Sequence, residues 1–267
     1  MSDRHPRRIV CLTQETCETL YLLGEQHRIV GISGFTVRPP QARREKPKVS
    51  AYTSARLDRI LALKPDLVLG FSDLQAPVAA SLVQAGLAVH VFNQRSVAGI
   101  LDMICVLGAL VGGPVKAQML IDQLQAGMDA TLSAAARLPR RPRVYFEEWD
   151  QPLISGIGWV SELIHLAGGE DCFAELGNRA AAQGRVIVDP GEVVRRAPDI
   201  IFGSWCGKRF RPRHLADRPG WDAIPALHNG QVFEIKSADI LSPGPAALDA
   251  GLRQLHQHIA ACARALP

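Results

Sequence analysis

Large aromatic side chains follow several apolar runs of this sequence, each at the point where a predicted strand ends. Phe71 follows residues 67–70, Trp149 follows residues 143–146 at a short distance, and Trp205 follows residues 200–203. Rings of this kind offer a wide apolar surface, and an indole adds one N–H donor. They suit a flat, partly apolar organic ligand. The competing interpretation of Trp205 is that it plugs the edge of a sheet.

Carboxylates lie beside Trp149, but their spacing does not predict catalysis. Glu147, Glu148 and Asp150 are close enough in sequence for acid–base chemistry. Adjacent residues of a strand point to opposite faces, so the three do not form a ready pair, and a solvated loop is the preferred interpretation. The histidines are scattered, and the six cysteines form no CxxC pair, so no metal site is predicted. Neither a nucleophile elbow nor a P-loop occurs, and we assign no catalytic residue.

Composition excludes several classes of function. Of 267 residues, 47% are hydrophobic and 21% are charged, which is typical of a globular protein. The net charge is +4, but the basic clusters carry no interleaved aromatics, so nucleic-acid binding is not expected. No apolar run reaches about 18 residues, so the chain is not expected to be membrane-embedded. Residues 1–8 are polar and resemble no leader, which predicts a cytoplasmic location; a periplasmic location is the alternative if a leader has been removed. The protein is expected to be a monomer.

A long amphipathic helix, predicted at residues 114–138, separates two similar halves. Pro114 suits a first helical turn, and apolar residues recur every three or four positions. The segment ILALKPDLVLG (60–70) returns as VVRRAPDIIFG (193–203), with its aspartate 133 residues later (199 − 66). The order of elements repeats as well, which predicts one α/β unit present in two copies.

The predicted fold class is therefore α/β, with two lobes built on mainly parallel sheets. The N-terminal lobe takes residues 1–113, the connecting helix 114–138 and the C-terminal lobe 139–267. Four strands are expected in the first lobe, at residues 9–12, 28–33, 67–70 and 87–92. A polar turn is expected at residues 13–15, and a long exposed loop at 34–47. In the second lobe, strands are expected at residues 143–146, 200–203 and 231–235, and a closing helix at 245–265.

Ligands of open α/β sheets bind beyond the carboxyl ends of the strands, so the loops there supply the candidate residues. The ligand-binding candidates in the first lobe are Gln14, Phe35, Tyr52, Ser54, Phe71 and Ser72. In the second lobe they are Glu148, Trp149, Arg185, Trp205, Lys208 and Asp239.

From about residue 8 to its end, the chain resembles the iron-siderophore and cobalamin class of ABC-transporter substrate-binding proteins. The resemblance is closest to the cobalamin-binding members, through LDRILALKPDLVL (57–69), PRVYFEEW followed by PLISG (142–156) and ELIHLAGGEDCF (162–173). It implies two lobes joined by a rigid helix, with a corrinoid held in the cleft between them and no catalysis. By position, it places the cobalamin-contacting aromatics on Tyr52 and Trp149.

The sequence departs from this family at three places. Members that feed a transporter carry a signal peptide, and they present one acid on each lobe to a permease. Here the second lobe keeps Glu192 as the docking residue, but the first-lobe position falls near Ala76, where there is no acid. The family's aromatic in the loop before the second-lobe docking helix is replaced by residues 180–185. A permease partner is therefore predicted with one docking acid missing.

Three other functions stay open. A ferric siderophore or haem could be bound through its anionic groups by Arg38, Arg185, Lys208 and Arg209. An enzyme acting on a corrinoid or tetrapyrrole could use Glu147 or Glu148 as acid or base. Alternatively, a carrier or sensor could report ligand occupancy to a partner protein through the surface around Glu192.

Overall fold

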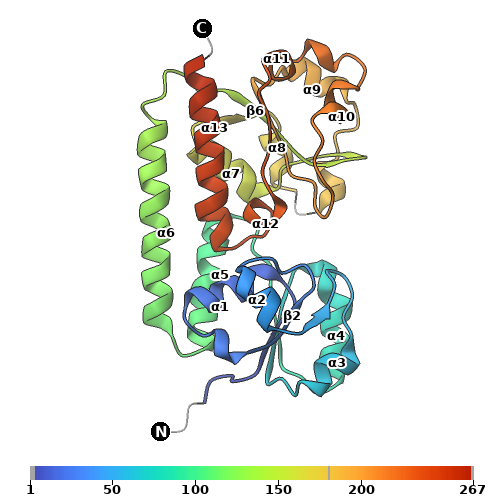
Figure 1. Ribbon diagram of the computed structural model, residues 1–267, viewed down its shortest axis with the longest axis vertical. Helices are drawn as coiled ribbons and strands as arrows, with labels where there is room; N and C mark the ends of the chain where they lie inside the picture. The colour runs from blue at the N-terminus through green and yellow to red at the C-terminus, as the bar shows by residue number, and fades with distance from the viewer. Residues whose placement is uncertain (1–3, 180, 266–267) are drawn as a thin grey trace. The chain divides into compact units, whose positions relative to one another are not determined.

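The computed structural model of the protein describes residues 4–179 and 181–265 (Figure 1). The chain folds into two compact units. The first unit takes residues 1–94 and 98–123, and the second takes residues 95–97 and 124–267. Helix α6 (Pro114–Ala135) is continuous through the boundary, which falls between Gln123 and Leu124. The predicted helix is thus present and ends three residues earlier than expected.

The first unit is built on a five-stranded parallel sheet of order β3-β2-β1-β4-β5. Its strands are β1 (Ile9–Cys11), β2 (Ile29–Ser33), β3 (Lys48–Ser50), β4 (Leu67–Phe71) and β5 (Val89–Phe92). All neighbouring pairs are parallel, so the carboxyl ends of the strands share one edge. The sequence predicted four strands; β3 is the fifth, and it is only three residues long.

Helices connect these strands, as parallel pairing requires. They are α1 (Gln14–Leu22), η1 (Gln26–Arg28), α2 (Pro40–Glu45), α3 (Leu57–Ala62), η2 (Asp73–Gln75), α4 (Ala76–Gln84) and α5 (Val97–Leu110). Two expectations were wrong. The predicted polar turn at residues 13–15 is the start of α1, where Gln14 and Glu15 are buried, and the predicted long loop contains α2. Pro40 occupies the first position of α2. A backbone N–H at that position would have no partner within the helix, so proline, which lacks this group, suits a helix start.

The second unit is built on a mainly parallel sheet of order β10-β9-β6-β7, with β8 also paired to β6. Its strands are β6 (Arg143–Asp150), β7 (Leu153–Ser155), β8 (Glu170–Asp171), β9 (Ile200–Gly203) and β10 (Val232–Glu234). Only the β6–β7 pair among them is antiparallel. Strand β6 runs four residues beyond the predicted strand. The acids at its end therefore lie on a strand, and the solvated loop expected there was wrong.

Short helices surround this sheet, and one longer helix closes the chain. They are α7 (Gly158–Leu166), α8 (Ala174–Gly177), η3 (Ala182–Arg185), α9 (Gly191–Arg196), α10 (Arg213–Ala216), η4 (Trp221–Ala223), α11 (Pro225–His228), α12 (Ser237–Ile240) and α13 (Leu252–Ala265), with a π-helical turn η5 (Ala247–Gly251) before α13. Trp159 of α7 is buried and donates from Nε1 to the carbonyl of Ile240, so it packs its helix against the rest of the unit.

The internal repeat predicted from the sequence has matching backbone geometry in the two units. Lys64 and Ala197, which are 133 residues apart, both adopt left-handed backbone with φ of 46° and 44°. Two residues later, Asp66 accepts backbone N–H groups of Arg7 and Arg8, and Asp199 accepts that of Arg143. Each aspartate therefore fixes the start of the central strand of its sheet, β1 or β6, in the same way.

Helix α6 packs closely on the first unit over its N-terminal half. A side chain at Gly108 of α5 would come within 2.2 Å of the Ala117 Cβ, so only glycine permits this approach. Lys116 also forms an ion pair with the largely buried carboxylate of Glu25 at 2.8 Å. Within the described residues, no helix is both long and apolar enough to cross a membrane.

Candidate ligand-binding site

Large apolar side chains are exposed at the carboxyl edge of the first sheet. Phe35, Tyr52 and Leu74 follow β2, β3 and β4, and they are 59%, 38% and 56% exposed. Exposed hydrophobic residues gathered in one region are typical of binding surfaces, because water otherwise disfavours them. The three residues come from separate loops that end at one sheet edge. They are called the apolar edge below.

Gln75 holds the backbone beneath the apolar edge. Its side chain is buried, and its Oε1 accepts the N–H of Phe71 at 3.0 Å. Its Nε2 donates to the carbonyl of Tyr52 at 2.8 Å and to that of Leu12 at 3.5 Å. One neutral amide therefore ties together the segments that follow β1, β3 and β4.

Ser72 turns the chain sharply at the end of β4. It is a non-glycine residue with φ of 66°, a conformation that costs about 1–3 kcal/mol. Its hydroxyl accepts the N–H of Leu74 at 3.3 Å, and its own N–H donates to the carbonyl of Phe92 at 2.7 Å. These two hydrogen bonds hold the turn that places Leu74 outside the core.

Helix α1 brings buried acids to the same edge. Gln14 is buried, and its Oε1 accepts the N–H groups of Val37 and Arg38 at 3.1 and 3.2 Å. Glu18 pairs with Arg38 at 2.8 Å. Burial raises the pKa of Glu15 to about 7, and the hydrogen bond with Thr13 offsets only part of that rise. The first turn of α1 therefore supports the loop after β2 from within.

The corresponding edge of the second sheet is ionic. Glu147 of β6 is fully buried and accepts two hydrogen bonds from the Arg218 guanidinium, at 2.6 and 3.0 Å. It also accepts from the Tyr145 hydroxyl and from Nε1 of Trp205, each at 3.0 Å. Burial, with the nearby Glu147 charge, holds the pKa of Tyr145 well above its usual range. This carboxylate thus fixes Trp205 and the segment around Arg218 against β6.

The two other acids of β6 have cations of their own. Glu148 accepts two hydrogen bonds from Arg185, at 2.5 and 3.0 Å, and the same guanidinium donates to the carbonyl of Ser155. Asp150 accepts from Lys208 Nζ at 2.6 and 2.9 Å. Each acid therefore binds a different segment of the unit to the end of β6.

Lys208 also lies over two indoles. Its Nζ is 4.8 Å from the ring centroid of Trp205 and 5.4 Å from that of Trp149, both within cation–π range. Trp149 is partly exposed and donates from Nε1 to the carbonyl of Gln151 at 2.9 Å. Trp205 is buried and meets Phe210 edge to face, so packing accounts for most of its surface.

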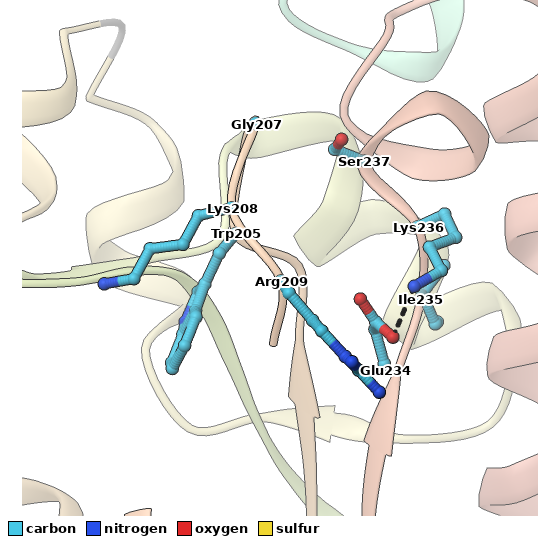
Figure 2. A pocket seen from close by; sticks show the side chains of 8 residues that line it. All are labelled: Trp205, Gly207, Lys208, Arg209, Glu234, Ile235, Lys236 and Ser237. Carbon is cyan, nitrogen blue, oxygen red and sulfur yellow. Dashed lines mark ion pairs between the residues drawn. The ribbon is translucent and has the colours of Figure 1, made fainter. Parts of the chain in front are cut away.

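A cavity of about 420 Å³ opens beside Trp205. Figure 2 shows its lining, which comes from the segment after β9 and the end of β10: Trp205, Gly207, Lys208, Arg209, Glu234, Ile235, Lys236 and Ser237. Three of these side chains are cationic, and the one acid, Glu234, pairs with Lys236 at 2.5 Å. We call this cavity the Trp205 pocket.

The predicted site residues differ in how accessible they are. The exposed ones are Phe35, Tyr52, Ser54 and Lys208, and the partly exposed ones are Glu148, Trp149 and Asp239. The buried ones are Gln14, Phe71, Ser72, Arg185 and Trp205. The buried members support the surface from below; the Arg185 side chain in particular is 2% exposed and is held by Glu148 and Ser155.

Sequence reasoning missed several residues that shape the two edges. Gln75, Leu74, Phe210 and Arg218 were not among the predicted site residues. A buried glutamine directly after a strand end carries no sequence signal of its own. The pairing of Arg218 with Glu147 spans 71 residues, so no local pattern could reveal it.

The predicted docking residue Glu192 lies in the first turn of α9. Its carboxylate accepts from Arg195 at 2.6 Å and from Arg196 at 2.9 Å, and these hydrogen bonds hold its pKa below the usual range. An arginine of a partner would therefore compete with two arginines of the same helix. As for metals, the described residues contain no group of three or more His, Cys, Asp or Glu side chains that could hold an ion.

Comparison with known proteins identifies the family. The periplasmic binding protein family matches residues 9–238. The chain belongs to this family. A vitamin B12-binding protein of Vibrio parahaemolyticus is 28% identical over 258 residues, which cover 94% of this chain and 88% of the relative. One from Vibrio cholerae is 26% identical over 251 residues, with 91% and 86% covered.

Solved structures of this periplasmic binding protein family share the fold. The heme-binding protein RhuT from Roseiflexus gives a TM-score of 0.83 at 22% identity, with 96% of this chain and 99% of that one covered. The vitamin B12-binding protein BtuF of Vibrio cholerae gives 0.76 at 22% identity, with 98% and 99% covered. The α/β fold with parallel-dominated sheets, predicted from the sequence, is confirmed.

Proposed function

We propose that this periplasmic binding protein binds cobalamin or a related corrinoid without converting it. The observation that carries the proposal is the apolar edge of the first unit, formed by Phe35, Tyr52 and Leu74. A corrin is a wide, nearly flat macrocycle with methyl groups on its faces and amides on its rim. Exposed rings and a leucine suit its faces, and the polar loop groups around them suit the amides.

The curated relatives support the same ligand. Proteins that cover most of this chain at 24–28% identity are named vitamin B12-binding proteins. The second unit supports binding over catalysis, because Glu147 and Glu148, the two candidate acids or bases, are each held by an arginine guanidinium. We further propose that the protein serves an ABC-type uptake system or acts as a carrier, and that Glu192 contacts the partner.

The first experiment is to incubate the protein with hydroxocobalamin, desalt it and record its visible spectrum. A retained corrinoid band is expected, and a shifted band would show that a side chain replaces the axial water. We expect Tyr52→Ala to weaken binding about tenfold or more, by removing a large exposed contact. Leu61→Ala is the matched control, because Leu61 is similarly exposed but lies on α3. A colourless protein, or equal binding by both variants, would contradict the proposal.

Haem is the second candidate, and a specific observation favours it. Tyr52 presents a partly exposed phenol on the loop after β3, and a phenolate is one of the axial ligands that proteins offer to haem iron. The same desalting test with haem decides between the two. A Soret band that is retained by the wild type and changed in Tyr52→Phe would favour haem over a corrinoid.

A further inference from the structure

The four cations that were candidates for holding anionic groups of a ligand have different surroundings. Arg38 pairs with Glu18, Arg185 with Glu148, and Lys208 with Asp150. Arg209 is exposed, and it forms no ion pair or hydrogen bond with any described residue. Three of these charges are therefore already neutralised within the protein, and the charge of Arg209 is not.

Arg209 lines the Trp205 pocket, so its charge is presented to whatever enters that cavity. Figure 2 shows its side chain extending toward Glu234, while the Lys208 side chain extends the other way. Glu234 is neutralised by Lys236, and Lys208 by Asp150. Once Asp150, which lies outside the lining, is counted with its partner Lys208, one positive charge remains in excess, and its source is Arg209.

The size of the pocket limits what it holds. A cavity of about 420 Å³ lies near the lower end of the range for small-molecule sites, about 300–1,000 Å³, and it is too small for an entire corrin or porphyrin. Of a ligand as large as these macrocycles, only a peripheral group would fit there. The lining offers N–H donors from Arg209 and Lys236 and a hydroxyl from Ser237, with the indole of Trp205 as an apolar wall.

We propose that the Trp205 pocket binds an oxyanion of the ligand through the Arg209 guanidinium, and that this contact selects ligands that carry such a group. The inference rests on the proposed function. A guanidinium presents two parallel N–H donors that match the oxygens of a phosphodiester or a carboxylate, so it favours an anion over a neutral amide. In a cobalamin the oxyanion is the phosphodiester that links the macrocycle to its nucleotide base. In haem it is a propionate.

The test compares cyanocobalamin with dicyanocobinamide, which has the same macrocycle and lacks the phosphodiester and the base. Dissociation constants are measured by calorimetry at low and high salt for the wild type, Arg209→Gln and Arg213→Gln. Arg213 is the matched control, because it is an exposed arginine four residues away and outside the pocket lining. We expect the wild type to prefer cyanocobalamin, and Arg209→Gln to lose about tenfold in that preference with unchanged cobinamide binding.

Each outcome separates this proposal from the proposed function. If Arg209→Gln lowers the affinity for both ligands equally, or for neither, the oxyanion contact is overturned while corrinoid binding stands. If the wild type binds neither corrinoid, the proposed function fails, and haem is compared with its dimethyl ester in the same three proteins. A preference for haem that disappears only in Arg209→Gln then supports the oxyanion contact. Equal affinity for haem and its ester, or no binding of either, overturns it.

Discussion

The two units share a scaffold but hold their ligand edges by different means. In the first unit, neutral amides of Gln14 and Gln75 fix the loops that present Phe35, Tyr52 and Leu74. In the second unit, three carboxylates of one strand bind three cations, and Glu147 and Asp150 thereby hold Trp205 and Lys208. The first edge presents apolar side chains on loops that amide hydrogen bonds hold, which we call the amide framework. The second presents cationic and aromatic side chains that ion pairs hold, which we call the ionic framework.

This difference indicates how a duplicated fold acquires an asymmetric surface. The Pro-Asp turns before β4 and β9 keep the same backbone geometry, with Asp66 and Asp199 in the same role. The divergence lies in the loops after the strands, where sequence changes do not disturb the sheet. Each unit has therefore acquired its own kind of edge on the same scaffold.

Among substitutions that distinguish the two frameworks, the one at Glu147 should change the free energy of unfolding most. We expect Glu147→Ala to lower the free energy of unfolding by about 3–5 kcal/mol, because it leaves the partly buried Arg218 guanidinium without its carboxylate. Gln75→Ala should cost about 1–3 kcal/mol, the range for losing a buried neutral hydrogen-bonding group. Urea unfolding monitored by circular dichroism measures both.

The control for this pair is Glu192→Ala. Glu192 also binds two arginines, but it lies on the surface, where solvent screens ion pairs, so its loss should cost far less stability than the loss of Glu147. If Glu147→Ala were no more costly than Glu192→Ala, burial would not be what gives the ionic framework its strength. Equal costs for Glu147→Ala and Gln75→Ala would remove the contrast between the two units.

The next largest effect should come from Glu15 of the first unit, which should make the free energy of unfolding depend on pH. Its pKa is raised from 4.5 to about 7 by burial, so the folded protein keeps this proton over a range where the unfolded chain has lost it. Its contribution to stability is therefore complete below about pH 4.5 and is lost as pH rises through about 7. The total is roughly 3 kcal/mol.

Unfolding midpoints at pH 5 and pH 8 test this assignment. The wild type should lose more stability between these values than Glu15→Gln, because a glutamine carries no titrating proton. Asp58→Asn is a suitable control, since Asp58 is a well-exposed acid of the same unit. A wild-type pH dependence that persists unchanged in Glu15→Gln would assign it to other groups.

The parts of the fold that the sequence predicted are those with local signals. The helix starting at Pro114, the Pro-Asp turns and the apolar strands were all visible in short windows. Strand β3 was not, because residues 48–50 contain a single buried side chain, that of Val49. Helix α2 was hidden because its segment is rich in proline and arginine, and proline occurs in turns as well as in first helical turns.

For the site, the sequence could select segments but not the role of each residue. The carboxyl-edge rule selected the segments that contain Tyr52 and Lys208, and the structure places them after β3 and β9. Their part in binding stays a prediction. The rule gave no means to distinguish exposed Phe35 from buried Phe71, because both follow predicted strands, whereas the structure includes Phe71 in β4. Nor could it pair Glu148 with Arg185 across 37 residues, because tertiary packing determines that contact.

The smallest expected effect tests the shared scaffold itself. Lys64 and Ala197 hold left-handed backbone at equivalent turns, which costs an L-residue about 1–2 kcal/mol. Glycine removes that strain but loses more entropy on folding, about 0.5–1 kcal/mol. We therefore expect Lys64→Gly and Ala197→Gly each to stabilise the protein by about 0.5–1 kcal/mol, measured as small increases in urea midpoint.

Ala62→Gly is the control for these turns, because Ala62 ends α3 in ordinary helical backbone and glycine there should destabilise by up to about 1 kcal/mol. Similar gains at residues 64 and 197 would mean that the strain belongs to the repeated turn and not to its surroundings. A gain in stability at only one of these residues would mean that the two units differ in their turns as well as in their loops. The same backbone geometry would then be held by different interactions in each unit.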